Sequence, residues 1–203
     1  MSSVDRYFER LAAVVTTIDG RAVDRLIDRI RGAGERGGTI YVLGNGGSAT
    51  TASHMALDLA KNARRTGQPG LRVFSLTDNV GLVTAWANDS HYDQVFAAQL
   101  EPLVRSGDVL VAVSASGRSP NVLAAVRTAN RAGACSFGVT GGTGGTLVAE
   151  ATDCVVVRSD DVQLIEDAHL AIVHAVTAAL RDGPESGVDV ENNARPDPVE
   201  VER

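Results

Sequence analysis

Two short segments of the chain combine glycine with hydroxyl side chains directly after an apolar run. They are GNGGS at 44–48 and SASGRSP at 114–120. Each runs into a segment with helical periodicity, where free backbone N–H groups and the positive end of the helix dipole attract anions. Serine and glycine also favour helix starts, so a capped turn explains either loop taken alone. The pair of loops favours a phosphate site that needs no lysine or metal.

Two further features of these loops allow other interpretations. The segment TGGTGG at 140–145 lacks serine, and we interpret it as a flexible connection. Gly44-x-Gly46-x-x-Ala49 fits the permissive dinucleotide fingerprint, with Asp78 as the acidic residue after the next strand. A dinucleotide leaves the second serine loop unexplained, and no stretch remains for a separate substrate domain. We therefore rank a sugar phosphate above a nucleotide cofactor and expect no such cofactor.

Histidines and carboxylates on two predicted helices could bind a metal or transfer protons. His54 and Asp58 share a helix face at i and i+4. On the last helix, Glu166 and His174 lie roughly 12 Å apart along the axis at about 1.5 Å per residue. One ion joins that pair only if both side chains are extended or the helix begins late. Imidazole and carboxylate suit Zn²⁺ or a similar divalent ion.

The remaining histidines have a simpler interpretation. We interpret His91 and His169 as ordinary hydrogen-bonded side chains, the usual state of a histidine beside an acid. His174 differs because it stands within the apolar run AIVHAV, where a polar ring must find a partner.

The elements that must position these residues alternate along the chain, which predicts a parallel sheet covered on both faces. The strands are expected at Thr39–Leu43, Arg72–Leu76, Asp108–Val113, Cys135–Val139 and Cys154–Val157. Two helices within 4–31, divided near Gly20, precede them. Further helices are expected at Thr50–Asn62, Val80–Asn88 continuing over Gln94–Val104, Pro120–Ala132, Thr146–Ala151 and Val162–Leu180.

Composition excludes several classes of function. The chain has 203 residues, with 44% hydrophobic and 22% charged residues, which is typical of one compact domain. Its net charge of −6 argues against nucleic acid and anionic membrane as partners. Cys135 and Cys154 lie in apolar stretches and are expected to be buried thiols in a reducing compartment. No run is long enough for a membrane span, so we expect a cytoplasmic protein.

The C-terminal residues 182–203 have a different character from the rest. They are rich in acidic, Asn and Pro residues and lack apolar periodicity, so we expect a disordered acidic tail. Residues 1–181, including the N-terminal helices, form the predicted domain.

The motifs taken together resemble the phosphoheptose isomerases of the SIS (sugar isomerase) domain superfamily. The likeness rests on LGNGGSA at 43–49 with His54, AND at 87–89, SASGRS at 114–119 and the segment from Glu166 to His174. It implies an α/β protein with the flavodoxin-like SIS fold, a three-layer α/β/α sandwich with a five-stranded parallel sheet. It also implies a homotetramer with active sites at subunit interfaces, which converts sedoheptulose 7-phosphate to D-glycero-D-manno-heptose 7-phosphate.

The resemblance assigns roles to individual residues. Asp58 would be the catalytic base and His174 the acid, and zinc or another divalent ion would be bound by His54, Asp58, Glu166 and His174. The substrate-binding residues would be Asn45, Gly46, Gly47, Ser48, Asp58, Asn88, Asp89, Ser114, Ala115, Ser116, Ser119 and Glu166.

Three positions depart from the usual pattern of that family. Asp58 stands where the family has Glu, Glu166 where it has Gln, and Ala115 where it has Thr. A carboxylate shorter by one methylene retracts by about 1.5 Å, which weakens proton abstraction unless the geometry adjusts. These departures leave the particular phosphosugar open. They also motivate an alternative, a non-catalytic SIS protein that binds a phosphosugar or another protein, as the relatives that regulate replication initiation do.

Overall fold

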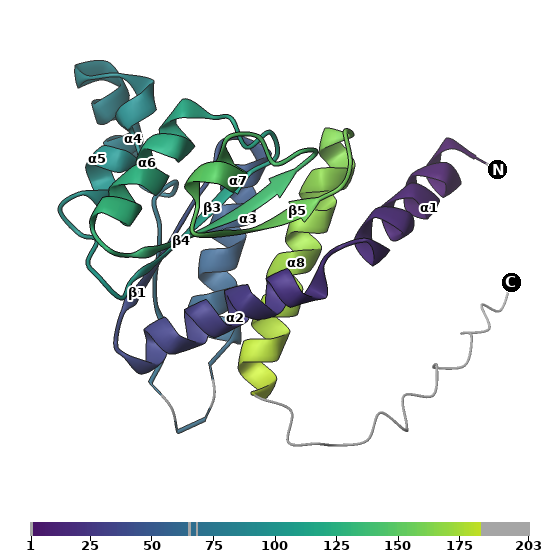
Figure 1. Ribbon diagram of the computed structural model, residues 1–203, viewed down its shortest axis with the longest axis horizontal. Helices are drawn as coiled ribbons and strands as arrows, with labels where there is room; N and C mark the ends of the chain where they lie inside the picture. Colours follow the sequence, from purple (N-terminus) through teal and green to yellow (C-terminus); the bar gives the residue numbers. More distant parts are fainter. Residues whose placement is uncertain (1, 65, 68, 184–203) are drawn as a thin grey trace, which may run out of the picture.

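A five-stranded parallel sheet forms the centre of the protein (Figure 1). The computed structural model describes residues 2–64, 66–67 and 69–183. The strand order is β2-β1-β3-β4-β5. The strands are β1 Thr39–Leu43, β2 Arg72–Ser75, β3 Val109–Ser114, β4 Cys135–Gly141 and β5 Asp153–Val157. The predicted sheet is confirmed, with strand ends within two residues of the expected ones.

The central strands are buried along their whole length because helices cover both faces of the sheet. In β1, Ile40 and Val42 face one core, while Tyr41 and Leu43 face the other. The register pairs Leu43 of β1 with Ala112 of β3, so these neighbouring strands end side by side. The loops that follow them therefore meet at the carboxyl edge of the sheet.

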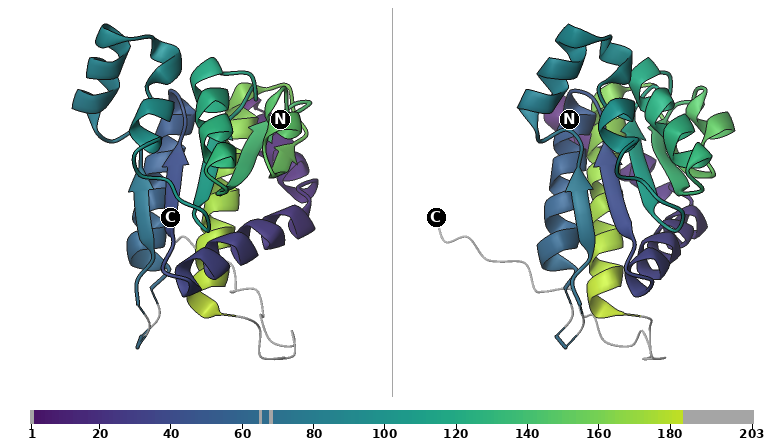
Figure 2. Two further views of the ribbon diagram at one scale, coloured as in Figure 1. Left: turned by 60° about the vertical axis from the view of Figure 1, so that its left-hand side comes forward. Right: turned by 90° about the vertical axis from the view of Figure 1, so that its left-hand side faces the viewer.

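Three helices form one covering layer, seen beside the sheet in Figure 2. They are α2 Gly20–Glu35, α3 Gly47–Leu57 and α8 Val162–Asp182. Leu26 and Ile30, four residues apart on α2, are fully buried. Burial of a side chain of this size stabilises the fold by roughly 1.5–3 kcal/mol.

Three other helices pack on the opposite face of the sheet. They are α5 Ala97–Leu100, α6 Pro120–Arg131 and α7 Leu147–Glu150. Helix α6 buries Val122, Val126 and Ala129 at helical spacing. Its start is set by Ser119 at the N-cap and by Pro120 in the first turn, where the missing N–H costs nothing.

Two predicted helices differ from the structure. The helix expected at Thr50–Asn62 begins earlier, at Gly47, and from Asp58 to Asn62 it becomes the π-helix η1. The prediction of a helix over Gln94–Val104 was wrong in its extent. It is divided into the 3₁₀ turn η2 Tyr92–Gln94 and the short α5, which ends at Leu100 because Pro102 has no N–H to continue the helical hydrogen bonds.

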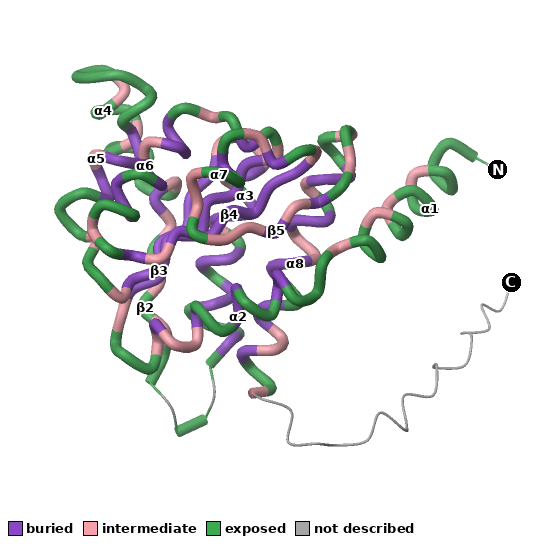
Figure 3. Tube along the Cα trace, in the orientation of Figure 1, coloured by how far each residue is buried: buried purple, intermediate pink, exposed green. Residues whose placement is uncertain are grey.

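Helices α1 Ser3–Thr16 and α4 Val80–Asp89 contain no buried residue. Figure 1 shows α1 extending away from the sheet, and Figure 3 shows both helices largely exposed. Phe8 of α1 is 62% exposed and Val80 of α4 is 68% exposed. Such apolar surface is unusual for a helix that faces only water.

The structure also bears on the predictions about membrane spans, the cysteines and the C-terminal segment. Within the described residues, no helix is long and apolar enough to cross a membrane. Cys135 and Cys154 are free thiols, although each is partly rather than fully buried. Helix α8 continues through Asp182, and the expected tail from residue 184 onward lies outside the described residues.

The interpretation of His169 as a hydrogen-bonded side chain was wrong. The ring is fully buried on α8, and neither ring nitrogen has a hydrogen-bond partner among the described residues. Burial lowers the pKa of His169 to about 4, and the nearby Thr140 backbone opposes this only weakly. His169 is therefore neutral in the folded protein at neutral pH.

We expect His169 to destabilise the fold in mild acid. The unfolded chain binds a proton at the ordinary pKa of about 6.5, whereas the folded chain binds it only near 4, so stability falls as the pH drops from 6.5 towards 4. Between pH 7 and 4.5, the unfolding free energy of wild type should fall by roughly 2–3 kcal/mol more than that of His169→Leu. Urea denaturation at both pH values measures this difference, with His91→Leu at an exposed position as control. Parallel pH profiles for wild type and His169→Leu would contradict it.

Candidate functional site

A cavity of about 480 Å³ opens at the carboxyl edge of the sheet. This volume is within the usual range for small-molecule sites. The loops after β1, β3, β4 and β5 contribute to it together with the start of α8. Its lining comprises Asn45, Ser48, Ser114, Ala115, Ser116, Arg118, Ser119, Gly141, Gly142, Thr143, Ser159, Asp160, Val162, Ile165 and Glu166. Most of the predicted substrate-binding residues are therefore brought together.

The loop after β1 turns sharply into α3. A side chain at Gly44 would collide with the backbone of Ser48, and Gly46 has a φ of +55°, which favours glycine. The turn places Ser48 in the first turn of α3, where backbone N–H groups have no partner within the helix. Asn45 is held at the cavity by two hydrogen bonds with Asn121, of 2.8 and 2.9 Å.

The serine loop after β3 presents hydroxyl protons to the same cavity. The Ser114 Oγ accepts from the Gly117 N–H at 3.2 Å, and the Ser116 Oγ accepts from the Arg118 N–H at 3.3 Å. The Ser114 and Ser119 hydroxyls also share one hydrogen bond at 3.4 Å, whereas the Ser116 proton remains available to a ligand. The Ser119 side chain makes no capping bond to α6. The loop is thus built to donate to an anion.

The loop at 140–145 is a wall of the cavity, which corrects its interpretation as a flexible connection. Gly141 donates its N–H to the Ala115 carbonyl at 3.1 Å, and Leu147 donates to the Gly117 carbonyl at 2.9 Å. A Cβ atom at Gly117 would overlap the Gly144 carbonyl, so both positions must stay small. Close backbone packing fixes this loop against the serine loop.

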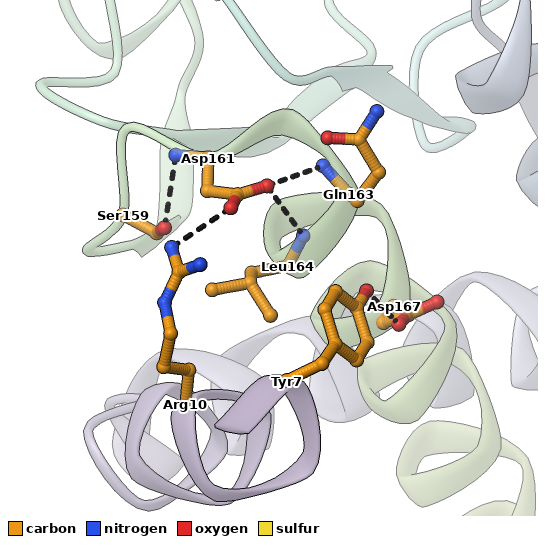
Figure 4. A network of polar contacts seen from close by, with 7 residues as sticks. All are labelled: Tyr7, Arg10, Ser159, Asp161, Gln163, Leu164 and Asp167. Atoms are coloured by element: carbon orange, nitrogen blue, oxygen red, sulfur yellow. Dashed lines mark hydrogen bonds and ion pairs between the residues drawn. The ribbon is translucent and has the colours of Figure 1, made fainter. Parts of the chain in front are cut away.

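The start of α8 is fixed from two sides (Figure 4). Asp161 caps the helix by accepting from the Gln163 N–H at 3.1 Å, and its other oxygen accepts from Arg10 of α1 at 2.8 Å. One turn later, the Tyr7 hydroxyl donates to Asp167 at 2.6 Å. This hydrogen bond raises the pKa of Tyr7 to about 12. Helix α1 thereby orients the end of α8 that lines the cavity.

Glu166 connects α8 to the first loop. Its carboxylate lies where a Cβ atom at Gly47 would be, so a side chain at Gly47 would displace the Glu166 carboxylate from this position. Glu166 lines the cavity at the carboxyl edge and lies outside the histidine group described next.

A second group of predicted residues converges at the far end of α3. The Nε2 atoms of His54 and His174 are 3.2 Å apart. The Asp58 Oδ2 lies 3.5 Å from the first and 3.9 Å from the second. Asp58 is buried, whereas both rings are partly exposed to an open hollow. His174 thus lies beside His54 and Asp58, but its side chain is 54% exposed, so the expectation that apolar surroundings require a partner was wrong.

The π-helix sets the position of Asp58. The wider turn closes with the Ala63 N–H donating to the Asp58 carbonyl at 2.9 Å. Asn62, four residues on, donates to the Asp58 Oδ1 at 2.7 Å and leaves Oδ2 facing the histidines. Single π-turns inside helices are frequent at functional sites.

Two predicted site residues lie elsewhere. Asn88 and Asp89, at the end of α4, are exposed, hydrogen-bond to one another at 2.8 Å and do not line the cavity. Several residues that line the cavity were not predicted from the sequence. One of them, Arg118, lies inside the SASGRS motif at 114–119. The others are Gly141, Gly142, Thr143, Ser159, Asp160, Val162 and Ile165. A signal was available for them, since they too follow strands at the carboxyl edge.

Comparisons with known proteins agree with this arrangement. A profile of the SIS domain family matches residues 6–141. The phosphoheptose isomerase of Roseiflexus sp. is 37% identical over 171 residues, which cover 84% of this chain and 82% of that protein. The enzyme of the same name from Desulfovibrio desulfuricans is 42% identical over 146 residues, or 72% of this chain and 69% of that one.

Solved structures show the same fold. A phosphoheptose isomerase from Francisella tularensis aligns with a TM-score of 0.83 at 29% identity, covering 90% of this chain and all of that one. The corresponding protein from Neisseria gonorrhoeae gives 0.82 at 27% identity, covering 89% and 97%. With its serine loops at the carboxyl edge of a five-stranded parallel sheet, the chain belongs to the SIS domain family and, within it, to the phosphoheptose isomerases.

Proposed function

We propose that the protein isomerises sedoheptulose 7-phosphate to D-glycero-D-manno-heptose 7-phosphate. The observation that carries this proposal is the cavity in which Ser114, Ser116 and Ser119 converge with the start of α3. Hydroxyl and amide donors at a helix N-terminus suit a phosphate. Two of the similar proteins are named phosphoheptose isomerases, which supports this proposal. No described feature favours the non-catalytic alternative over the isomerase.

The chemistry moves a proton between C1 and C2 through an enediol, which needs a base near carbon and an acid near oxygen. In our proposal Asp58 takes the proton from carbon and His174 carries protons to and from oxygen. Only the Asp58 Oδ2 is free for this role, because Asn62 occupies Oδ1. A carboxylate that also binds a metal is a weaker base, so the two roles compete for that one oxygen.

The donor set near Asp58 fits a divalent ion such as zinc. Two imidazole nitrogens and one carboxylate oxygen lie within 4.8 Å of one another. A tetrahedral ion with bonds of about 2.1 Å separates its ligand atoms by roughly 3.4 Å, close to the observed spacings. Three protein ligands with an open position are typical of catalytic zinc. A bound ion would polarise the sugar carbonyl. Glu166, the fourth predicted ligand, would belong instead to the sugar site.

The substrate site is proposed to lie between subunits of a homotetramer. Ser48 and Asp58 are ten residues apart on one helix, or roughly 15 Å along its axis. The seven carbons of an extended sugar span roughly 8 Å, and the phosphate ester and the contacts at both ends add several ångströms. Only a fully extended substrate would therefore reach from a phosphate held at Ser48 to Asp58 of the same chain. A neighbouring copy can supply the catalytic group, and also Asn88 and Asp89, which lie away from the cavity.

The exposed apolar helices support such an assembly. Val4, Phe8 and Val15 form a stripe on α1. Helix α4 also exposes large apolar side chains, namely Val80, Leu82 and Trp86. A 14-residue helix is marginal in water without packing partners, so a second copy is the natural cover for α1.

The proposal extends to cellular location and partners. Free thiols and a phosphorylated substrate suit a reducing compartment, and we place the protein in the cytoplasm. The net charge of −6 leaves no role for nucleic acid or membrane as partners.

Asp58→Asn should abolish turnover while the fold is kept. Loss of the base should lower kcat by at least 10²-fold, because general base catalysis contributes about 10²–10⁴. Proton NMR in D₂O measures the step itself, because it follows loss of the C1 proton of sedoheptulose 7-phosphate and deuterium incorporation at C2 of the aldose product. Asp28→Asn, at an exposed site on α2, is the matched control. Exchange at the wild-type rate in Asp58→Asn would refute the assignment.

The protein should bind one zinc ion per chain through the histidine group. Dialysis against Zn²⁺ followed by elemental analysis measures the stoichiometry, and thermal unfolding gives a second readout, since a ligand of the native state raises Tm. His54→Ala should lose both the ion and the rise in Tm, whereas His91→Ala should keep both. Equal zinc content in the two variants would contradict the site.

Phe8→Asp should weaken the assembly. A carboxylate within the apolar stripe of α1 opposes burial between chains, since an unpaired buried charge is costly. Light scattering coupled to size exclusion should show a tetramer for wild type and a smaller species for the variant. Glu9→Asp, on the same helix, should leave the mass unchanged. A monomeric wild type would rule out the interface.

A further inference from the structure

A second cavity, of about 470 Å³, lies at the opposite edge of the sheet. Its walls come from the segment before β1, the first residues of β2, and the segment from Pro102 to Asp108 before β3. These are the amino ends of the strands, whereas the serine loops follow the carboxyl ends. The two cavities share no lining residue. The proposed isomerase reaction makes no use of this second cavity.

Three arginines, Arg36, Arg72 and Arg105, line this second cavity. Within the described part of the chain, none of the three forms an ion pair with an acidic side chain. The one acidic lining residue, Asp108, is buried, and its two oxygens accept from the Thr39 and Arg105 N–H groups, both at 2.8 Å. The cavity therefore has a local excess of two positive charges in a chain of net charge −6.

The charges of two of these arginines affect the buried Tyr41, which lines the cavity. Burial raises the pKa of the Tyr41 phenol, and Asp108 adds to this, while Arg72 and Arg105 both oppose it. Both guanidinium groups therefore lie close enough to exert their charge on a buried lining residue. An anion at this place would meet donors that suit phosphate or carboxylate oxygens in pairs.

The same cavity has an aromatic and aliphatic wall. Tyr41 of β1 and Phe74 of β2 are paired in register and stack with ring centres 6.2 Å apart and an angle of 24° between planes. Phe74 is 54% exposed, and Leu103 on the same cavity is 50% exposed. These side chains leave a flat apolar surface open beside the three arginines. Phosphate alone would not use that surface.

We propose that this cavity binds a nucleoside phosphate, with the phosphate at Arg72 and Arg105 and the base against Phe74. Aromatic stacking and guanidinium pairing are the two contacts that such a ligand requires, and here they occur in one cavity. The ligand is bound at a distance from the reacting sugar, and it is distinct from the cofactor considered for the Gly44–Ala49 loop. The proposal does not depend on the identity of the substrate at the carboxyl edge.

Isothermal titration of the purified full-length protein tests the proposal. The probes are AMP, GMP, CMP and UMP, the corresponding nucleosides, and inorganic phosphate, each with and without saturating sedoheptulose 7-phosphate. The variants are Arg72→Gln, Arg105→Gln and Phe74→Ala, all at exposed positions. Arg21→Gln, exposed on α2 and outside the cavity, is the matched control.

At least one nucleotide should bind tenfold or more tightly than both its nucleoside and inorganic phosphate. Each cavity variant should weaken that binding about tenfold, as expected for the loss of one charged or stacking contact of about 1.4 kcal/mol. Arg21→Gln and saturating sugar phosphate should have no effect. The proposal is overturned if no nucleotide binds, if inorganic phosphate binds as tightly, if the cavity variants bind like wild type, or if the sugar phosphate displaces the nucleotide.

Discussion

The site depends on the contact between two loops that follow neighbouring parallel strands. Because β1 and β3 are parallel neighbours and β3 ends two residues beyond the partner of Leu43, the glycine loop and the serine loop meet at one edge, and both open helices that point their N-termini at the cavity. Glycine is required at Gly44 and Gly117 because backbone atoms of other segments occupy the space of a side chain. These contacts place amide and hydroxyl donors around a volume suited to phosphate.

The rest of the proposed chemistry follows from the length of α3. The helix begins at the phosphate cavity and ends at Asp58, where the π-helix turns the carboxylate towards His54 and His174. One chain therefore holds a phosphate site and a proton-transfer group that a single sugar would span only when fully extended. The exposed apolar stripe of α1 and the hydrogen bonds that connect α1 to the start of α8 then acquire a common explanation, because assembly of several copies would complete each site.

Much of this could be predicted from the sequence because periodicity and strand-end motifs are local signals. The strands, the phosphate loops and the pairing of His54 with Asp58 all follow from short segments. What could not be predicted depends on tertiary contacts. The loop at 140–145 is rigid only because Gly144 packs on Gly117, and Glu166 faces the first loop because Gly47 leaves room for it. The environment of His169 is likewise set by burial under the sheet, and no spacing in the sequence reveals it.

The most direct measurement is a crystal structure of the protein with sedoheptulose 7-phosphate bound. The account predicts the phosphate within hydrogen-bond distance of the Ser114, Ser116 and Ser119 hydroxyls and of the backbone N–H groups at the start of α3, with C1 and C2 directed towards Asp58 of a neighbouring copy. A phosphate bound elsewhere, with these three serines turned away from it, would contradict the account.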